Sequence, residues 1–108
     1  MRLSHFVLQV TAGGALLLCA SSAAAAPRAY PIFIDKMKFG PLPAQLHKGD
    51  SIVWINRDFL RHSATAADHS FDVDLPAGAK GKTVFTKSGT IAFVCRYHPG
   101  MRGVLQVK

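Results

Sequence analysis

Residues 90–107 read TIAFVCRYHPGMRGVLQV, and this stretch decides the class of fold. Residues 90–95 and 103–107 are rich in β-branched and aromatic side chains, which favour β-strands. Between them, Pro99 restricts the backbone and Gly100 allows a tight return. The stretch therefore predicts two strands joined by a short loop.

Similar runs recur through the rest of the chain, and none of them has helical periodicity. We expect strands at residues 30–34, 36–39, 51–56, 62–66, 71–74, 82–85, 90–95 and 103–107, separated by turns. Seven to eight short strands in one domain indicate an all-β protein with an antiparallel β-sandwich. Trp54, the single tryptophan, is expected to anchor the core between the sheets, with Phe85, Phe93 and Val94.

The first 25 residues have the pattern of a secretory signal peptide. Arg2 gives a positive start, residues 6–20 are largely apolar, and small residues follow up to Pro27. The apolar run is too short to span a bilayer comfortably. We expect cleavage after Ala25, which releases one soluble, monomeric domain, residues 26–108, into the periplasm without a membrane anchor.

The expected mature chain is basic. Of the 13 Lys and Arg residues only Arg2 lies in the leader, so 12 remain against 6 Asp and no Glu, a net charge of about +6. Such a surface can bind nucleic acid, an acidic membrane or an acidic protein. Export argues against nucleic acid, and the basic residues are scattered rather than grouped with aromatics. We expect a solvated surface that steers the protein toward a negatively charged partner.

A thiol, an imidazole and a thioether lie close together at Cys95, His98 and Met101. These are ligands that a mononuclear copper site takes from one loop, and His62, 33 residues before the cysteine, offers the second imidazole. Removal of the leader also removes Cys19, so no intramolecular disulfide can form. A single cysteine alone would indicate an inert, buried side chain, but its neighbours favour a metal site.

Zinc is the main rival metal, because it also accepts histidine and cysteine. Methionine is a poor zinc ligand, however, and the position of Met101 would then lack a reason. His47 and His69 lie in polar turns, and we expect both to be exposed and outside the site.

The chain resembles the cupredoxin, or plastocyanin/azurin-like, family. The resemblance rests on GDSIVWINR at residues 49–57, on His62, and on FVCRYHPGMRG at residues 93–103. It extends over residues 37–107, and the short Cys-x-x-His-x-x-Met loop is most similar to that of the amicyanins. The resemblance implies an eight-stranded Greek-key sandwich that binds one copper ion per chain through His62, Cys95, His98 and Met101.

The resemblance also implies a function. We expect a type 1 (blue) copper protein that shuttles single electrons between periplasmic redox partners. Its partner would bind transiently and have an acidic surface, as a dehydrogenase or a c-type cytochrome. The alternative is a periplasmic protein that captures or delivers copper without redox turnover. We expect no enzyme. The sequence lacks the His-x-His pairs of multicopper oxidases and a hydrolytic constellation, and the expected mature chain keeps one cysteine, whereas a binuclear copper centre needs two.

Two residues depart from the pattern of the amicyanin-like proteins. Ser63 stands where an asparagine commonly braces the two ligand-bearing loops, so we expect weaker support for the thiolate. Tyr97 stands where many relatives have proline, beside His98. We expect electrons to pass through the exposed edge of this histidine, within a ring of positive charge formed by Arg57, Arg61, Arg96 and Arg102.

Overall fold

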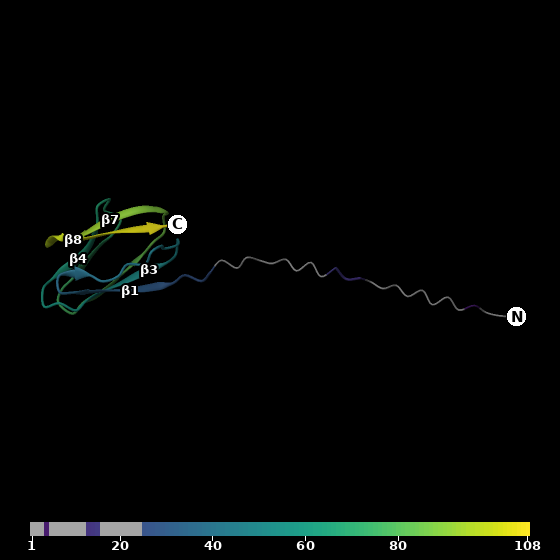
Figure 1. Ribbon diagram of the computed structural model, residues 1–108, viewed down its shortest axis with the longest axis horizontal. Coiled ribbons are helices and arrows are strands. Elements are labelled where there is room, and N and C mark those ends of the chain that lie inside the picture. The colour runs from purple at the N-terminus through teal and green to yellow at the C-terminus, as the bar shows by residue number, and fades with distance from the viewer. Residues whose placement is uncertain (1–3, 5–12, 16–24) are drawn as a thin grey trace.

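The computed structural model describes residues 4, 13–15 and 25–108. The predicted signal peptide, residues 1–25, therefore lies almost entirely outside the described residues. Among the residues that are described, we find no helix with the length and apolar character needed to cross a membrane. Residues 29–107 contain eight strands that form two four-stranded sheets (Figure 1).

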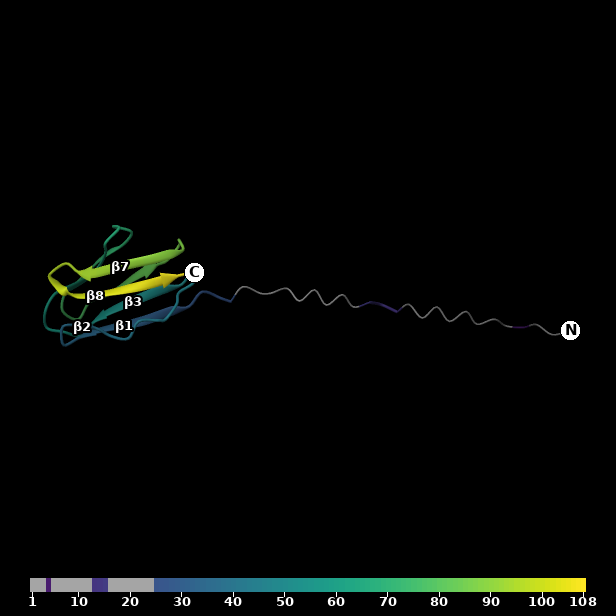
Figure 2. The ribbon, with the colours of Figure 1, turned by 45° about the horizontal axis from the view of Figure 1, so that its top comes forward.

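The two sheets make up the predicted sandwich (Figure 2). The first contains, in spatial order, β2 (Lys38–Phe39), β1 (Ala29–Asp35), β3 (Ser51–Asn56) and β6 (Lys80–Val84). The second contains β5 (Asp72–Leu75), β4 (His62–Ala66), β7 (Gly89–Cys95) and β8 (His98–Val107). Strands β4 and β7 are neighbours although β5 and β6 separate them in sequence, as expected for Greek-key connections. The predicted all-β sandwich of seven to eight strands is confirmed.

One pairing differs from the antiparallel expectation. Strands β1 and β3 run parallel, from the Ala29–Ser51 pair to the Ile34–Asn56 pair, whereas the other ladders are antiparallel. Parallel neighbours need a long crossover connection, and residues 36–50 provide it. Leu46, within this connection, forms an isolated parallel bridge with Val107 at the end of β8.

Two strand boundaries also differ from the predictions. The alternating run 36–39 is not one strand, because Lys36 and Met37 take positive φ angles of 51° and 62° and reverse the chain between β1 and β2. The last strand begins at His98 rather than at residue 103, and this histidine pairs with Cys95 across a local shift in register. The predicted copper loop is thus the closed end of a β-hairpin.

The core lies between the sheets and supports the end of β7. Trp54 is fully buried, its ring centroid lies 5.2 Å from that of Phe93, and its indole N–H donates to Thr83 Oγ1 at 3.0 Å. Phe85 is also buried, which confirms three of the predicted core residues. Val94 is only half-buried, because alternate residues of a strand point to opposite faces. This packing fixes the strand that carries the predicted thiolate ligand.

Candidate metal site

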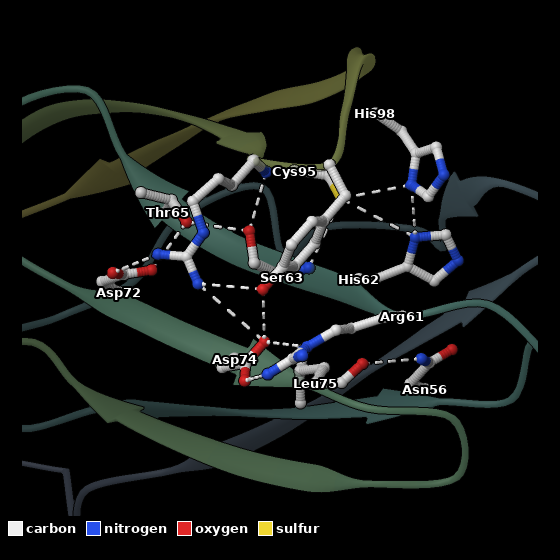
Figure 3. Close-up of polar contacts among 12 residues, drawn as sticks. Asn56, Arg61, His62, Ser63, Thr65, Asp72, Asp74, Leu75, Cys95 and His98 are labelled. Carbon is white, nitrogen blue, oxygen red and sulfur yellow. Dashed lines mark hydrogen bonds and ion pairs between the residues drawn. The ribbon is translucent and has the colours of Figure 1, made fainter.

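The structure brings three of the four predicted ligands together. Cys95 ends β7, His98 begins β8, and His62 begins β4 (Figure 3). The Cys95 Sγ atom lies 3.7 Å from Nδ1 of each histidine, and the two Nδ1 atoms lie 3.2 Å apart. All the donor atoms lie within 4.8 Å of one another. One metal ion can therefore contact a sulfur and two nitrogens.

The donors differ in their exposure to solvent. His62 and Cys95 are both 0% exposed, whereas His98 is half-buried. The two imidazole rings meet edge to face, with centroids 4.9 Å apart. The site is therefore closed on the protein side and reaches the surface through one imidazole.

The fourth predicted ligand, Met101, lies in β8 and is 6% exposed. It belongs to the same buried cluster as Cys95. Its predicted role as a thioether ligand stays a prediction. His47 and His69 are exposed and do not belong to the donor cluster, which includes only His62, Cys95 and His98 among the described residues.

A carboxylate holds the outer nitrogen of the buried histidine. His62 Nε2 lies 2.8 Å from Asp58 Oδ2. The pKa of Asp58 is held below its usual value, mainly by the backbone N–H of Met37, with further help from His62 and Lys36, although burial opposes this. The carboxylate therefore accepts a hydrogen bond from Nε2–H, and Nδ1 is the ring atom that faces the other donors. Sequence reasoning missed Asp58, although an acidic residue four positions before a histidine ligand could have indicated it.

Ser63 retains the brace between the two ligand-bearing segments. Its backbone N–H donates to Cys95 Sγ at 3.4 Å, and its hydroxyl accepts the backbone N–H of Arg96 at 2.7 Å. The same hydroxyl lies 2.9 Å from Thr65 Oγ1, which donates to Asp72 at 2.8 Å. Serine at this position therefore still links the two segments, because its hydroxyl reaches the backbone beside the cysteine.

We expect Ser63→Ala to lower the free energy of unfolding of the metal-free protein by about 1–3 kcal/mol, because it leaves the Arg96 N–H without its acceptor. Chemical denaturation measures this change. Thr90→Val is the control, since it removes an exposed side-chain hydrogen bond to Gln106, and should cost less than about 0.5 kcal/mol. Equal losses of unfolding free energy in Ser63→Ala and Thr90→Val would contradict the role of Ser63 as a brace.

The arginines around the site are not all free to steer a partner. Arg61 forms an ion pair with Asp74, and Arg96 forms one with Asp72 at 2.7 Å. Tyr97 lies between the two arginines and donates its hydroxyl proton to Asp74 at 3.1 Å. The expected ring of four positive charges is therefore partly neutralised on this side.

The other two arginines make different contacts. The Arg57 guanidinium lies 3.7 Å from the centroid of the Phe33 ring, and Arg102 donates to the carbonyl of Pro99 at 3.1 Å. Neither the aromatic ring nor the carbonyl neutralises charge, so these two contacts leave both guanidinium groups positive.

The ion pair at Asp74 predicts a particular pH dependence. The hydrogen bond from Arg61, with help from Tyr97, lowers the pKa of Asp74 to about 2. A depressed carboxyl pKa stabilises the fold above the unfolded value, 3.8, and this contribution disappears as the pH falls through about 2. We expect the difference in melting temperature between wild type and Asp74→Asn to be constant above about pH 5 and to shrink toward pH 2. A difference that does not change with pH would contradict this assignment.

Comparison with known proteins identifies the family. The Cupredoxin-like domain family matches residues 8–107, nearly the whole chain. The chain belongs to the cupredoxin-like family. This cupredoxin is 28% identical over 103 residues to amicyanin from Paracoccus denitrificans, and the match covers 82% of this chain and 72% of the relative. The predicted resemblance to the amicyanins is thereby confirmed.

Solved structures agree with this family. A Cu(I) form of an amicyanin mutant is 28% identical and superposes with a TM-score of 0.63, covering 74% of this cupredoxin and 82% of that chain. The purple cupredoxin from Nitrosopumilus maritimus, at 21% identity and a TM-score of 0.64 over 73% and 99% of the chains, shares the fold. A copper-containing nitrite reductase from Thermus scotoductus, at 23% identity and a TM-score of 0.66, also shares the fold over 74% of this chain, which spans 22% of the reductase chain.

The donor set of this cupredoxin fits copper. A thiolate suits Cu(I), and imidazole nitrogen suits either oxidation state. His62, Cys95 and His98 present these atoms in one small cluster in which no group needs to move far to contact an ion. The chemistry of the site thus agrees with the copper prediction.

Proposed function

We propose that this cupredoxin is a type 1 copper protein that carries single electrons between redox partners. The observation that supports this most strongly is the asymmetry of the donor cluster. A buried cysteine sulfur and a buried imidazole lie beside a second imidazole that reaches the surface. Such a site offers a short route for an electron between the buried donors and the surface.

Copper bound here supplies a one-electron couple between its Cu(I) and Cu(II) states. His62, Cys95 and His98 would hold it, and the Met101 thioether would be a further, weaker ligand. The three donors come from β4 and from the β7–β8 hairpin of one rigid sandwich. A rigid scaffold keeps their positions nearly constant between the two oxidation states, which favours rapid electron transfer.

We propose that the redox partner docks at the exposed edge of His98. The neighbouring Tyr97 is 40% exposed and Pro99 is exposed, so a close and weakly polar contact can form there. Arg57 and Arg102 add positive charge that would attract an acidic partner, such as a dehydrogenase or a c-type cytochrome. A small interface and electrostatic steering suit a shuttle that must release its partner quickly.

The cellular setting follows from the same proposal. Residues 1–25 would act as a cleaved signal peptide, and residues 26–108 would work in the periplasm as a soluble monomer. No enzymatic activity is proposed, since the described donor cluster is fully accounted for by one mononuclear site.

Electron exchange tests the proposal. The mature chain, loaded with copper, should give a reversible potential by voltammetry and exchange electrons with a c-type cytochrome in stopped-flow mixing. The rate should fall as ionic strength rises if the cytochrome surface is acidic. Slow exchange combined with ready loss of Cu(I) to a chelator would instead favour copper delivery.

A further inference from the structure

The turn between β1 and β2 has an unusual backbone. Lys36 and Met37 are consecutive residues with φ angles of 51° and 62°. Positive φ is disfavoured for residues with a side chain, and two-residue turns of this type usually contain asparagine and glycine. Neither residue is buried, so packing of their side chains does not explain the conformation. Another part of the molecule must stabilise this turn.

That part is the Asp58 carboxylate, which lies more than 20 residues away in sequence. Its Oδ1 accepts the backbone N–H of Lys36 at 2.7 Å, and its Oδ2 accepts that of Met37 at 2.9 Å. The same Oδ2 accepts the Nε2 proton of His62 at 2.8 Å. One carboxylate therefore joins both N–H groups of the turn to the buried imidazole.

The backbone of Asp58 is fixed separately. Its N–H donates to Oδ1 of Asn56 at 2.9 Å, and Asn56 is 1% exposed and donates in turn to the carbonyls of Leu60 and Leu75. This anchor sets the position of the residue but not the rotation of its carboxylate. The Asp58 side chain is 13% exposed, so water could compete for it if the turn were lost.

We propose that Lys36 and Met37 are positioning residues for the metal site: their backbone N–H groups orient Asp58, which orients His62. The proposal rests on the copper function proposed above. The proposed effect of the turn passes through the Asp58 carboxylate, which accepts both N–H groups. The lowered pKa of Asp58 agrees with this arrangement, because the hydrogen bond from the Met37 N–H is the largest cause of the shift.

The test changes the turn without touching Asp58 or His62. Valine disfavours the left-handed conformation, whereas Asn-Gly favours it, so Lys36→Val/Met37→Val should disrupt the turn and Lys36→Asn/Met37→Gly should preserve it. His69→Val is the matched control, because His69 has a φ of 62° in another exposed turn and lies outside the donor cluster. Met37→Val alone serves if the double valine variant does not fold.

Two measurements are made on each folded variant. In the metal-free protein, NMR follows the exchange of the His62 Nε2 proton with water. We expect this exchange to be at least about 10-fold faster in the two turn-disrupting variants, Lys36→Val/Met37→Val and Met37→Val. The Asn-Gly variant and the His69→Val control should keep the wild-type exchange rate. Competition with a chelator gives the Cu(I) affinity, which should fall about 10- to 100-fold in the turn-disrupting variants and stay unchanged in the other variants.

Two results would overturn the proposal. The turn-disrupting variants could have a lower melting temperature but keep wild-type proton exchange and Cu(I) affinity. In that case the turn stabilises the hairpin and does not position His62. An unprotected Nε2 proton in the wild type would show that Asp58 does not hold the ring. The proton measurement needs no copper, so it distinguishes failure of this proposal from failure of the proposed copper function.

Discussion

Replacing Cys95 with serine is expected to abolish the intense visible absorption of the copper-loaded protein. In the proposed type 1 site this absorption would arise from charge transfer between the Cys95 sulfur and Cu(II), and serine supplies no sulfur. A neutral hydroxyl is also a poor ligand for Cu(I). The loss of Cu(I) affinity should exceed the roughly 10- to 100-fold that removal of an outer hydrogen-bond partner costs. Visible spectroscopy and chelator competition measure the two effects.

The variant should still fold, which makes the result interpretable. Cys95 is buried, and the Ser63 N–H that donates to its sulfur can donate to a hydroxyl in the same place. Ser63→Ala is the matched comparison, because it alters the support of the thiolate but keeps the sulfur and should keep the colour. Persistence of the absorption band in Cys95→Ser would show that copper binds elsewhere.

Removing either histidine is expected to eliminate the wild-type spectrum, but only one loss should be reversible. In His98→Gly the missing ring leaves an opening to solvent, since His98 is half-buried in the wild type. Free imidazole can then enter and restore the nitrogen ligand. In His62→Gly the opening is enclosed, since His62 is 0% exposed and its neighbour Asp58 closes the outer side. Imidazole should therefore restore the spectrum of His98→Gly and not that of His62→Gly.

This pair of variants tests the proposed electron route. Each loses one imidazole, so each serves as the control for the other. The measurement is a titration of the copper-loaded variants with imidazole, followed by visible absorption. Equal recovery in both, or recovery only in His62→Gly, would contradict the assignment of His98 as the exposed edge of the site.

Much of the site could be predicted from sequence because its ligands follow local rules. Cys95, His98 and Met101 lie within seven residues, where residue type and spacing favour copper over zinc. His62 required more, since its approach depends on the pairing of β4 with β7. The sequence offers His62 as the second imidazole, and the resemblance to a known family supports its place in the site.

The supporting contacts could not be predicted, because they depend on tertiary structure. Asp58 reaches the turn at Lys36 only because that turn adopts positive φ angles, which the alternating sequence there does not indicate. The ion pair between Arg96 and Asp72 depends on strand register, with Asp72 opposite Thr65 on the neighbouring strand. The parallel pairing of β1 and β3 likewise results from a long connection whose path is not evident from composition.

The most direct test is a crystal structure of the copper-loaded mature chain, with diffraction data collected at the copper absorption edge to locate the metal. We predict one copper ion per chain, bound by Cys95 Sγ and by Nδ1 of His62 and His98, with the Met101 sulfur at a longer axial distance. Copper bound instead at the exposed His47 or His69, or an imidazole of His62 turned away from the ion, would contradict the proposed copper site.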